Sequence, residues 1–290
     1  MDVKKEAAEF LRTRRARITP DRAGLPAWGG ARRVPGLRRE EVALLAGVSA
    51  EYYVRLERGN LAGVSESVLE AVANALQLDE AERSHLFDLA RAASTRQRTP
   101  APRRAVRPPV QWLLDAMGGT AAYVRNPRTD LLAANALGRA LYAPVYEMAG
   151  PPNVARFVFL DPRAREFFTD WDRIARDAAA LLRTMAGEHP FDAGLTHLVG
   201  ELSTRSDHFR TLWAAHDVRL HRTGTKRFHH PVVGDLTLAF EGMDLTADAG
   251  LRLNAYVAEP GTPSADAFAL LASWAATPVT PSTAPQTNLT

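Results

Sequence analysis

The stretch from residue 37 to residue 60, LRREEVALLAGVSAEYYVRLERGN, constrains the fold more than any other part of the chain. Residues 38–46 contain strong helix formers and neither Gly nor Pro, which predicts a short helix. Gly47 can adopt the positive φ that ends a helix, and Ser49 is a good N-cap for a second helix over residues 50–58. The stretch therefore predicts two short helices joined by a tight turn.

Two helices joined by a Gly-containing turn form the helix-turn-helix unit, whose second helix enters the major groove of DNA. The alternative is an ordinary helical hairpin buried in an all-α domain. The small Ala43, the apolar Val48 and the inward positions of the second helix all fall at the offsets that the DNA-binding unit requires. The side chains that we expect at or near DNA are Arg14, Arg33, Arg38, Arg39, Ser49, Ala50, Glu51, Tyr52, Tyr53, Arg55 and Arg58.

The charge of the chain is distributed unevenly, which fits a DNA-binding N-terminal part. Residues 1–107 contain 20 Lys and Arg against 14 Asp and Glu, whereas the remainder contains 16 against 19. A basic N-terminal third suits a polyanion, and the acidic remainder argues against nucleic acid held along the whole length.

Helix signals and composition divide the chain into two domains. A helix over residues 6–17 precedes the helix-turn-helix, and capping boxes at Ser67/Glu70 and Asp79/Glu82 open two more helices after it. Five helices thus form an all-α domain over residues 1–93. The Pro- and Arg-rich residues 94–109 are expected to be a linker, 110–276 a second domain and 277–290 a disordered tail.

The second domain is predicted to be α+β with one antiparallel sheet. Residues 121–125 and 130–134 read as a hairpin around Asn-Pro-Arg, and three further strands are expected at 225–228, 236–241 and 251–258. Helical segments lie between the two groups of strands, and a last helix is expected over residues 265–275. Helices on one face of such a sheet leave room for a cavity between the layers.

The sequence also resembles a known family over nearly its whole length. Residues 32–59 resemble the signature of Xre-type helix-turn-helix regulators of the MmyB-like branch. The segments LLAAN, NVARFVFLDP, ELSTRSDHFRTLWAAHDV, TKRFHHPVVGDLTLAFE and AYVAEPGTPSADAFALL resemble the ligand-binding domain of that branch in order and spacing. The resemblance implies a PAS-like second domain and lipid-like ligands such as fatty acids. Ala134 stands where family members commonly have Trp, so we expect any pocket there to differ in size.

Aromatic residues of the second domain are its candidate pocket walls, although most aromatics in such a domain belong to the core. Large apolar side chains with a few polar anchors are typical of small-molecule pockets. The candidate ligand-binding residues are Trp112, Tyr123, Asn135, Tyr142, Phe157, Phe159, Phe168, Trp171, Arg210, Trp213, His216 and Tyr256.

The histidines do not predict a metal site. His229 and His230 are adjacent and point to opposite faces of a strand, and His208 and His216 are two helical turns apart. The chain has no Cys, so disulfides and Cys-based zinc or redox sites are excluded.

These features predict a transcriptional regulator, and specifically a repressor, with a C-terminal sensor for a small apolar or lipid-like effector. No catalytic motif occurs, so we expect no enzyme activity and no cofactor. The expected partners are a double-stranded DNA operator, the effector and a second copy of the chain in a homodimer. No apolar run is long enough to span a bilayer, so we expect a cytoplasmic protein without a membrane partner. The alternative function is a DNA-binding protein whose second domain docks a protein partner.

Overall fold

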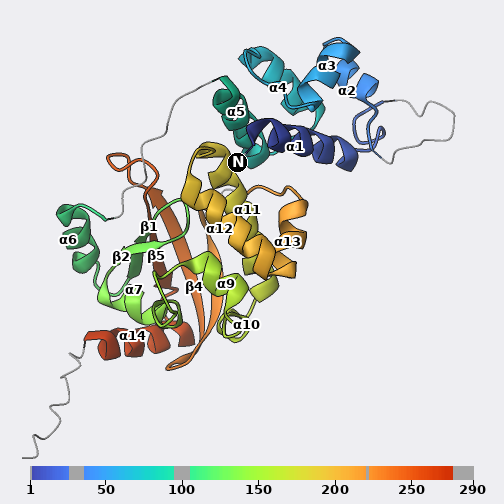
Figure 1. The fold of residues 1–290 in the computed structure, drawn as a ribbon. Helices are drawn as coiled ribbons and strands as arrows, with labels where there is room; N and C mark the ends of the chain where they lie inside the picture. The colour runs from blue at the N-terminus through green and yellow to red at the C-terminus, as the bar shows by residue number, and fades with distance from the viewer. Residues whose placement is uncertain (1, 26–35, 95–104, 220–221, 277–290) are drawn as a thin grey trace, which may run out of the picture.

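The computed structural model describes residues 2–25, 36–94, 105–219 and 222–276. The described chain forms an N-terminal helical domain and a C-terminal domain with one sheet (Figure 1), which confirms the predicted fold class. The five helices of the first domain are α1 (Val3–Arg17), α2 (Arg39–Leu45), α3 (Ala50–Glu57), α4 (Glu66–Ala75) and α5 (Glu80–Ser94). The predicted linker and tail fall largely on residues outside the described ranges.

Helices α2 and α3 form the predicted helix-turn-helix. Gly47 has φ +64° and ends α2, and the backbone N–H of Tyr52 donates to Ser49 Oγ at 3.1 Å, so Ser49 caps α3. Gly59 ends α3 with φ +81°, and a Cβ there would lie 1.9 Å from the carbonyl oxygen of Lys4 on α1. Only Gly therefore lets α1 approach the end of α3 this closely.

The cap of α4 differs from the prediction. Ser65, not Ser67, is the N-cap, because the N–H of Val68 donates to Ser65 Oγ, and Ser67 is already inside the helix. Glu70 pairs with Arg83 on α5 instead of closing a capping box. The predicted box at Asp79 and Glu82 is confirmed, since each side chain accepts the other's backbone N–H, at 2.8 and 3.2 Å.

The C-terminal domain is built on one antiparallel five-stranded sheet of order β2-β1-β5-β4-β3. Its strands are β1 (Ala121–Arg125), β2 (Leu131–Ala134), β3 (Thr223–His230), β4 (Gly234–Asp244) and β5 (Arg252–Ala258). Burial alternates along β3 and β4, so one face of these strands is buried and the other exposed.

Helices cover the sheet unequally on its two faces. α6 (Pro108–Ala116) packs Val110 and Leu114 against Ala122, Val124 and Leu253 on one face. The other face carries an aromatic core and the remaining helices (Figure 1). These helices are α7 (Ala136–Leu141), α8 (Ala143–Tyr146), α9 (Val154–Leu160), α10 (Ala164–Phe167), α11 (Trp171–Glu188), α12 (Ala193–Arg205), α13 (Asp207–Ala214) and α14 (Pro263–Ala276).

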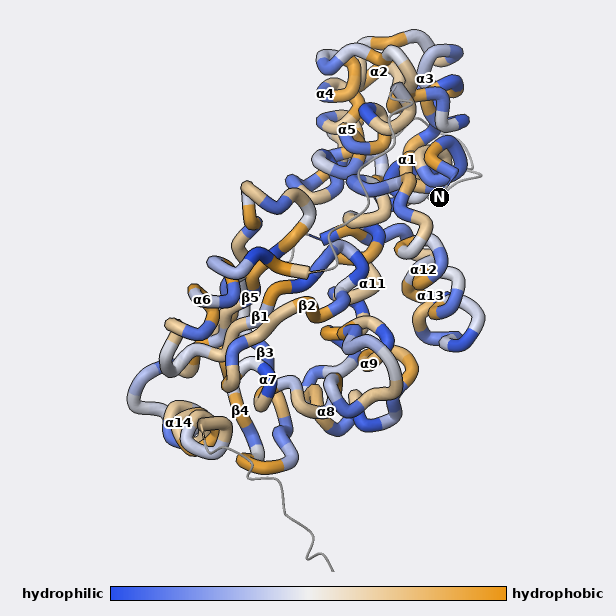
Figure 2. The backbone as a smooth tube through the Cα atoms, turned by 60° about the vertical axis from the view of Figure 1, so that its left-hand side comes forward, coloured by the Kyte–Doolittle hydropathy of each residue, from blue (hydrophilic) through white to orange (hydrophobic). Residues whose placement is uncertain are grey.

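Apolar segments are short and spread over both domains (Figure 2). Within the described ranges, no helix combines the length and the apolar character needed to cross a membrane.

Candidate functional site

The outer face of α3 presents cationic side chains to solvent. Glu51, Arg55 and Arg58 are exposed, and the guanidinium of Arg55 lies 4.6 Å from the centre of the Tyr52 ring. Among the described residues no carboxylate pairs with Arg55. Its donors are therefore free to reach base edges or phosphates.

Other residues expected at DNA have roles inside the domain. Tyr53 is fully buried inside the domain, and burial raises its pKa. Ser49 uses its hydroxyl to cap α3. The guanidinium of Arg39 pairs with buried Glu57, which Arg15 contacts from α1. Arg38 remains exposed at the start of α2, where it can face a phosphate, whereas Arg33 lies outside the described residues.

Arg14 lies between the two domains rather than on an open surface. Its side chain is 2% exposed, its Nε lies 2.8 Å from Glu82 Oε1, and its Nη2 donates to the carbonyl oxygen of His216. Its guanidinium is thus occupied within the protein.

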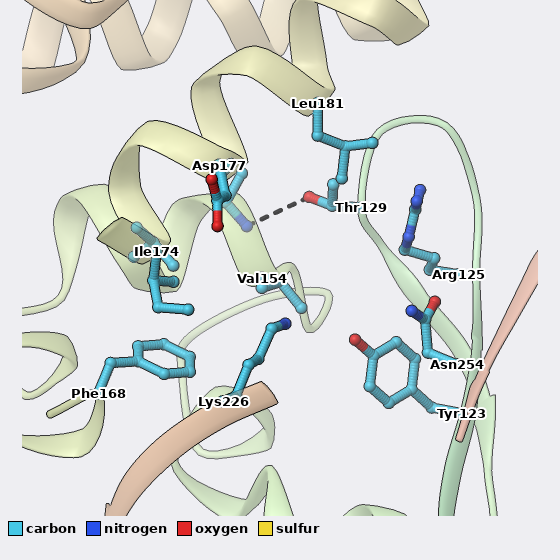
Figure 3. A pocket seen from close by; sticks show the side chains of 13 residues that line it. Tyr123, Arg125, Thr129, Val154, Phe168, Ile174, Asp177, Leu181, Lys226 and Asn254 are labelled. Atoms are coloured by element: carbon cyan, nitrogen blue, oxygen red, sulfur yellow. Dashed lines mark hydrogen bonds between the residues drawn. The ribbon is translucent and has the colours of Figure 1, made fainter. Parts of the chain in front are cut away.

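A small pocket lies between the inner face of the sheet and helices α9 and α11 (Figure 3). The sheet contributes Tyr123, Lys226 and Asn254, and α11 contributes Ile174, Asp177 and Leu181; Val154, Val158, Phe168, Arg125 and Thr129 complete most of the wall. The cavity measures about 40 Å³. This volume holds only a few water molecules, so an effector of larger size requires the walls to move.

A buried lysine of the pocket wall is hydrogen-bonded to a cluster of three tyrosines, of which Tyr123 also lines the pocket. Lys226 Nζ donates to Tyr256 Oη at 3.0 Å, and Tyr256 Oη lies 2.8 Å from Tyr142 Oη and 3.3 Å from Tyr123 Oη. Burial, aided by the charge of Arg125, lowers the pKa of Lys226 to about 7. The pocket therefore holds an amine that is only partly charged at neutral pH.

We expect Lys226→Met to stabilise the protein most at pH 7 and below, and to lose this advantage toward pH 10. The unfolded lysine has a pKa of about 10.4. The cost of burying its charge is therefore absent above that pH, grows as the pH falls toward 7, and is constant below it. Urea unfolding at pH 6, 8 and 10 measures the difference from the wild type. Arg227 lies on the exposed side of the same strand, so the stability difference between Arg227→Met and the wild type should not change with pH. A stability difference for Lys226→Met that is also independent of pH would contradict the buried charge.

The other residues expected in a pocket are placed as follows. Tyr123 and Phe168 line the pocket, and Tyr142 and Tyr256 support it through their hydroxyls. Asn135 accepts the N–H groups of Gly138 and Ala122, so it caps α7 and joins it to β1. Five residues that we expected in the pocket do not line it, because they are packed elsewhere or exposed: Trp112, Phe157, Phe159, Trp171 and Arg210.

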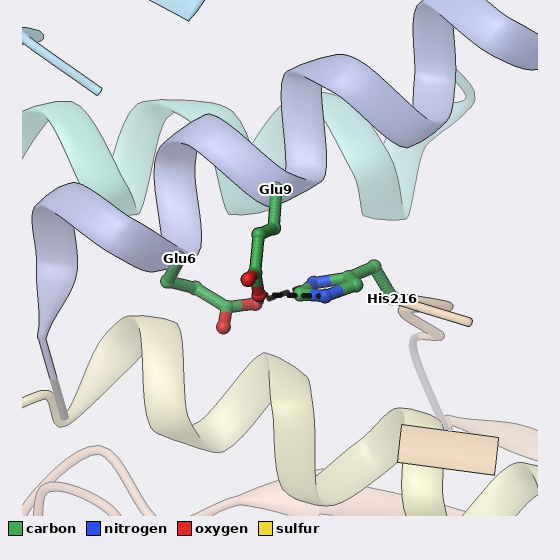
Figure 4. A group of neighbouring side chains, drawn as sticks. All are labelled: Glu6, Glu9 and His216. Atoms are coloured by element: carbon green, nitrogen blue, oxygen red, sulfur yellow. Dashed lines mark hydrogen bonds and ion pairs between the residues drawn. The ribbon is translucent and has the colours of Figure 1, made fainter. Parts of the chain in front are cut away.

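Trp213 and His216 lie at the contact between the domains, next to a buried ion pair. Arg183 of α11 is 1% exposed, pairs with Glu6 of α1 and lies 3.9 Å from the centre of the Trp213 ring. His216 Nε2 is 3.0 Å from Glu9 Oε2, and Figure 4 shows Glu6 and Glu9 directed from α1 toward the imidazole. Burial raises the pKa of Glu6, but the contact with His216, the nearby imidazole of His85 and the charge of Arg183 outweigh it, so the pKa is lowered.

This cluster holds the N-terminal helical domain against the second domain. Glu6, Glu9 and His216 could in principle ligate an ion, since their ligand atoms lie within 4.8 Å of one another. The guanidinium of Arg183 already supplies the cation at Glu6, which argues for an ion-pair network instead. His216 has φ 54°, a conformation that costs free energy and persists only where the surroundings hold it.

Several of these residues were absent from the sequence-based predictions. Every second residue of β3 from Lys226 to His230 shares one face of the strand, and on β1 Arg125 shares the face of Tyr123. Strand periodicity alone could therefore have placed Lys226 and Arg125 on the inner face. Glu6 and Arg183 lie 177 residues apart, and no local pattern connects them.

Comparison with known proteins adds two matches. Residues 106–271 match the family model of the MmyB-like transcription regulator ligand binding domain, and residues 6–86 match that of a helix-turn-helix domain. The search of curated proteins finds no match.

Proposed function

The chain belongs to the family of MmyB-like transcription regulators, and we propose that it is a one-component repressor whose second domain responds to a small effector. The observation that carries this proposal is the position of α11. This helix lines the pocket with Ile174, Asp177 and Leu181, and its next half-turn brings Arg183 to Glu6 of the DNA-binding domain. One helix thus both lines the candidate effector pocket and contacts α1.

The proposed effector is a small molecule with an apolar part. The pocket wall is mostly apolar, and polar side chains such as Tyr123, Lys226 and Asn254 supply groups that fix a ligand's orientation. Binding enlarges the small cavity and moves α11, which changes the placement of α1. The effector can shift DNA binding only by its difference in affinity for the two arrangements.

The direct test is to purify the full chain, denature it and identify co-extracted small molecules by mass spectrometry. A DNA site selected from a random duplex pool then serves to measure operator affinity with and without the identified compound. A compound that lowers operator affinity supports a ligand-responsive repressor. An unchanged affinity at saturating compound contradicts the sensor function.

We propose that the operator-binding form is a homodimer, because a helix-turn-helix unit commonly reads two half-sites one helical turn apart. Exposed apolar side chains on α6 and α14 are candidate contacts for the second copy: Trp112, Leu113, Leu270 and Trp274. Sedimentation of the full chain should give twice the 31.7 kDa of one chain. If the chain sediments as a monomer with the selected DNA bound, these side chains favour the alternative, a docking surface for another protein.

Arg55→Ala is expected to weaken specific DNA binding by about 1–3 kcal/mol and to relax sequence preference, because Arg55 is an exposed cationic donor on the outer face of α3. Arg38→Ala should instead weaken specific and random DNA alike and reduce the salt slope by about one unit. Fluorescence anisotropy with both duplexes over a salt series measures each effect. Arg205→Ala on α12 is the charge-matched control. If wild type and Arg55→Ala bind the selected duplex with equal affinity, the placement of α3 in the major groove is wrong.

A further inference from the structure

Lys226 is a rare residue type in this chain and has an unusual position. Of the 36 Lys and Arg residues, only Lys4, Lys5 and Lys226 are lysines. Lys4 and Lys5 are exposed on α1, whereas Lys226 is 6% exposed and lines the small pocket. An arginine stays charged when it is buried, but a buried lysine can lose its proton and become a nucleophile. Lys226 is therefore placed where a reactive amine can form.

The surroundings of Lys226 favour its neutral form. Among the described residues no carboxylate forms an ion pair with its Nζ, which donates to Tyr256 Oη at 3.0 Å. Burial and the charges of Arg125 and Arg173 disfavour protonation of the amine. Asp177 favours it, but Asp177 has Arg173 as a partner of its own at 3.8 Å. The lone pair of Nζ is thus available for a reaction.

Two other groups that line the same cavity are buried without partners. Within the described ranges, Arg125 Nη2 and Asn254 Oδ1 have no hydrogen-bond partner, and the two residues are 4% and 1% exposed. Figure 3 shows the extended side chain of Lys226 pointing into the space that Arg125 and Asn254 border from the sheet. Buried polar atoms without partners are costly. The cavity therefore offers an unused donor and an unused acceptor near the amine.

Arg125 is also a buried cation without an anion. The described residues place no carboxylate within ion-pair distance of it, and its Nη1 donates to the carbonyl oxygen of Asn126 at 3.3 Å. Its direct neighbour across the sheet is Arg252 on β5, a second cation on the same face. A buried charge without a partner loses its hydration and gains nothing in return. An anionic group formed inside the cavity would therefore be stabilised by Arg125.

The size of the cavity selects what can reach Lys226 while the walls stay in place. Its volume of about 40 Å³ admits only a molecule as small as a few waters. Dissolved carbon dioxide is an uncharged molecule of three heavy atoms, it enters apolar spaces, and it reacts with neutral amines to give carbamates. It matches the cavity in size, polarity and reactivity.

We propose that Lys226 is a modification site at which carbon dioxide forms a carbamate. The lone pair of Nζ forms a bond to the carbon atom, one C=O electron pair moves onto oxygen, and one Nζ proton is released to water. The anionic carbamate oxygens accept from Nη2 of Arg125, and the remaining N–H donates to Oδ1 of Asn254. This inference goes beyond the proposed sensor function and does not depend on it.

The test is carbon-13 NMR of the full chain with labelled bicarbonate at pH 8, where the carbamate carbon is resolved from bicarbonate. We expect a carbamate signal that disappears in Lys226→Met and persists when Lys4 and Lys5 are both replaced by Arg. It should reach half intensity at a bicarbonate concentration at least about tenfold lower than the signals of the exposed amines, since a charge-assisted hydrogen bond contributes on this scale. A wild type without this signal, or a signal that survives in Lys226→Met, overturns the proposal.

Variants of the two unpartnered groups test how the carbamate is held. Arg125→Met should raise the bicarbonate concentration for half intensity at least about tenfold, and Asn254→Leu should raise it as well. Arg205→Met, which removes an exposed pair with Glu201, is the control and should leave it unchanged.

The effect of Arg125→Met should persist at pH 9, where a modest rise in the pKa of Lys226 no longer matters. An effect that vanishes at pH 9 would mean that Arg125 acts only on the amine, and would overturn its assignment as the partner of the carbamate. Should Arg125→Met fail to fold, Asn254→Leu still removes the acceptor of the carbamate N–H. An unchanged concentration for half intensity in that folded variant overturns the proposed geometry.

Discussion

Arg183→Met is expected to lower the free energy of unfolding by about 3–5 kcal/mol at neutral pH, the usual cost of breaking a buried ion pair. Arg183 is 1% exposed and pairs with Glu6 across the domain contact, so its removal leaves a buried carboxylate without its cation. The pKa of Glu6 is lowered in the folded protein, and its pairing therefore stabilises the fold above the unfolded pKa of about 4.3. This stability is lost as the pH falls below that value, so the difference between variant and wild type should shrink in acid.

A double-mutant cycle with Glu6→Gln separates the pair from its surroundings. The double variant should be more stable than Arg183→Met alone, because it no longer buries an unpaired charge. Arg205→Met removes an exposed pair with Glu201 and should cost no more than about 1 kcal/mol. If Arg183→Met costs no more than this control, the buried pair does not hold the domains together.

The same variant tests how the domains communicate. If α11 transmits the effector signal through Arg183 and Glu6, an Arg183→Met protein that still folds should bind operator but respond less to the effector. An alternative route for the signal is the linker predicted at residues 94–109, which lies mostly outside the described ranges. A full effector response in the variant would favour that linker over the contact between α1 and α11.

The sequence predicted those parts of the fold whose signals are local. Gly47 and Ser49 specify the turn and cap of the helix-turn-helix within a few residues, and the structure has both. The cap of α4 was assigned two residues late because Ser65 and Ser67 offer the same kind of hydroxyl; in the structure their Oγ atoms lie 3.0 Å apart. Choosing between them depends on where the preceding loop allows the helix to begin.

Parts of the candidate site depended on contacts that no local pattern encodes. The pairing of Arg125 with Arg252 follows from the register of β1 on β5, which brings together residues far apart in the chain. His216 was singled out as a polar group for a pocket, and instead it meets α1 of the other domain. Aromatic residues predicted the pocket lining poorly, since the core and the pocket wall contain the same kinds of side chain. Buried charged residues indicate the position of the pocket better.

Gly59→Ala is expected to cost about 2–5 kcal/mol of stability, because it adds a steric clash to an unfavourable backbone conformation. Gly59 has φ +81°, and its new Cβ would lie 1.9 Å from the carbonyl oxygen of Lys4. Gly63 provides the matched control: it has φ +73°, but nothing lies within 4 Å of an added Cβ. Gly63→Ala should therefore cost only about 1–2 kcal/mol, the price of the backbone conformation alone.

The difference between the two glycine variants measures the contact of α1 with the end of α3. To relieve the clash, α1 must move away from Gly59, and α1 also carries Glu6 and Glu9 to the second domain. Thermal unfolding measures stability, and anisotropy with the selected duplex measures DNA affinity with and without effector. We expect Gly59→Ala to weaken the effector response more than Gly63→Ala does, because only the former displaces the helix that joins the DNA-reading helix to the pocket domain. Equal costs and equal responses in the two variants would show that α1 does not transmit the signal to α3 at this point.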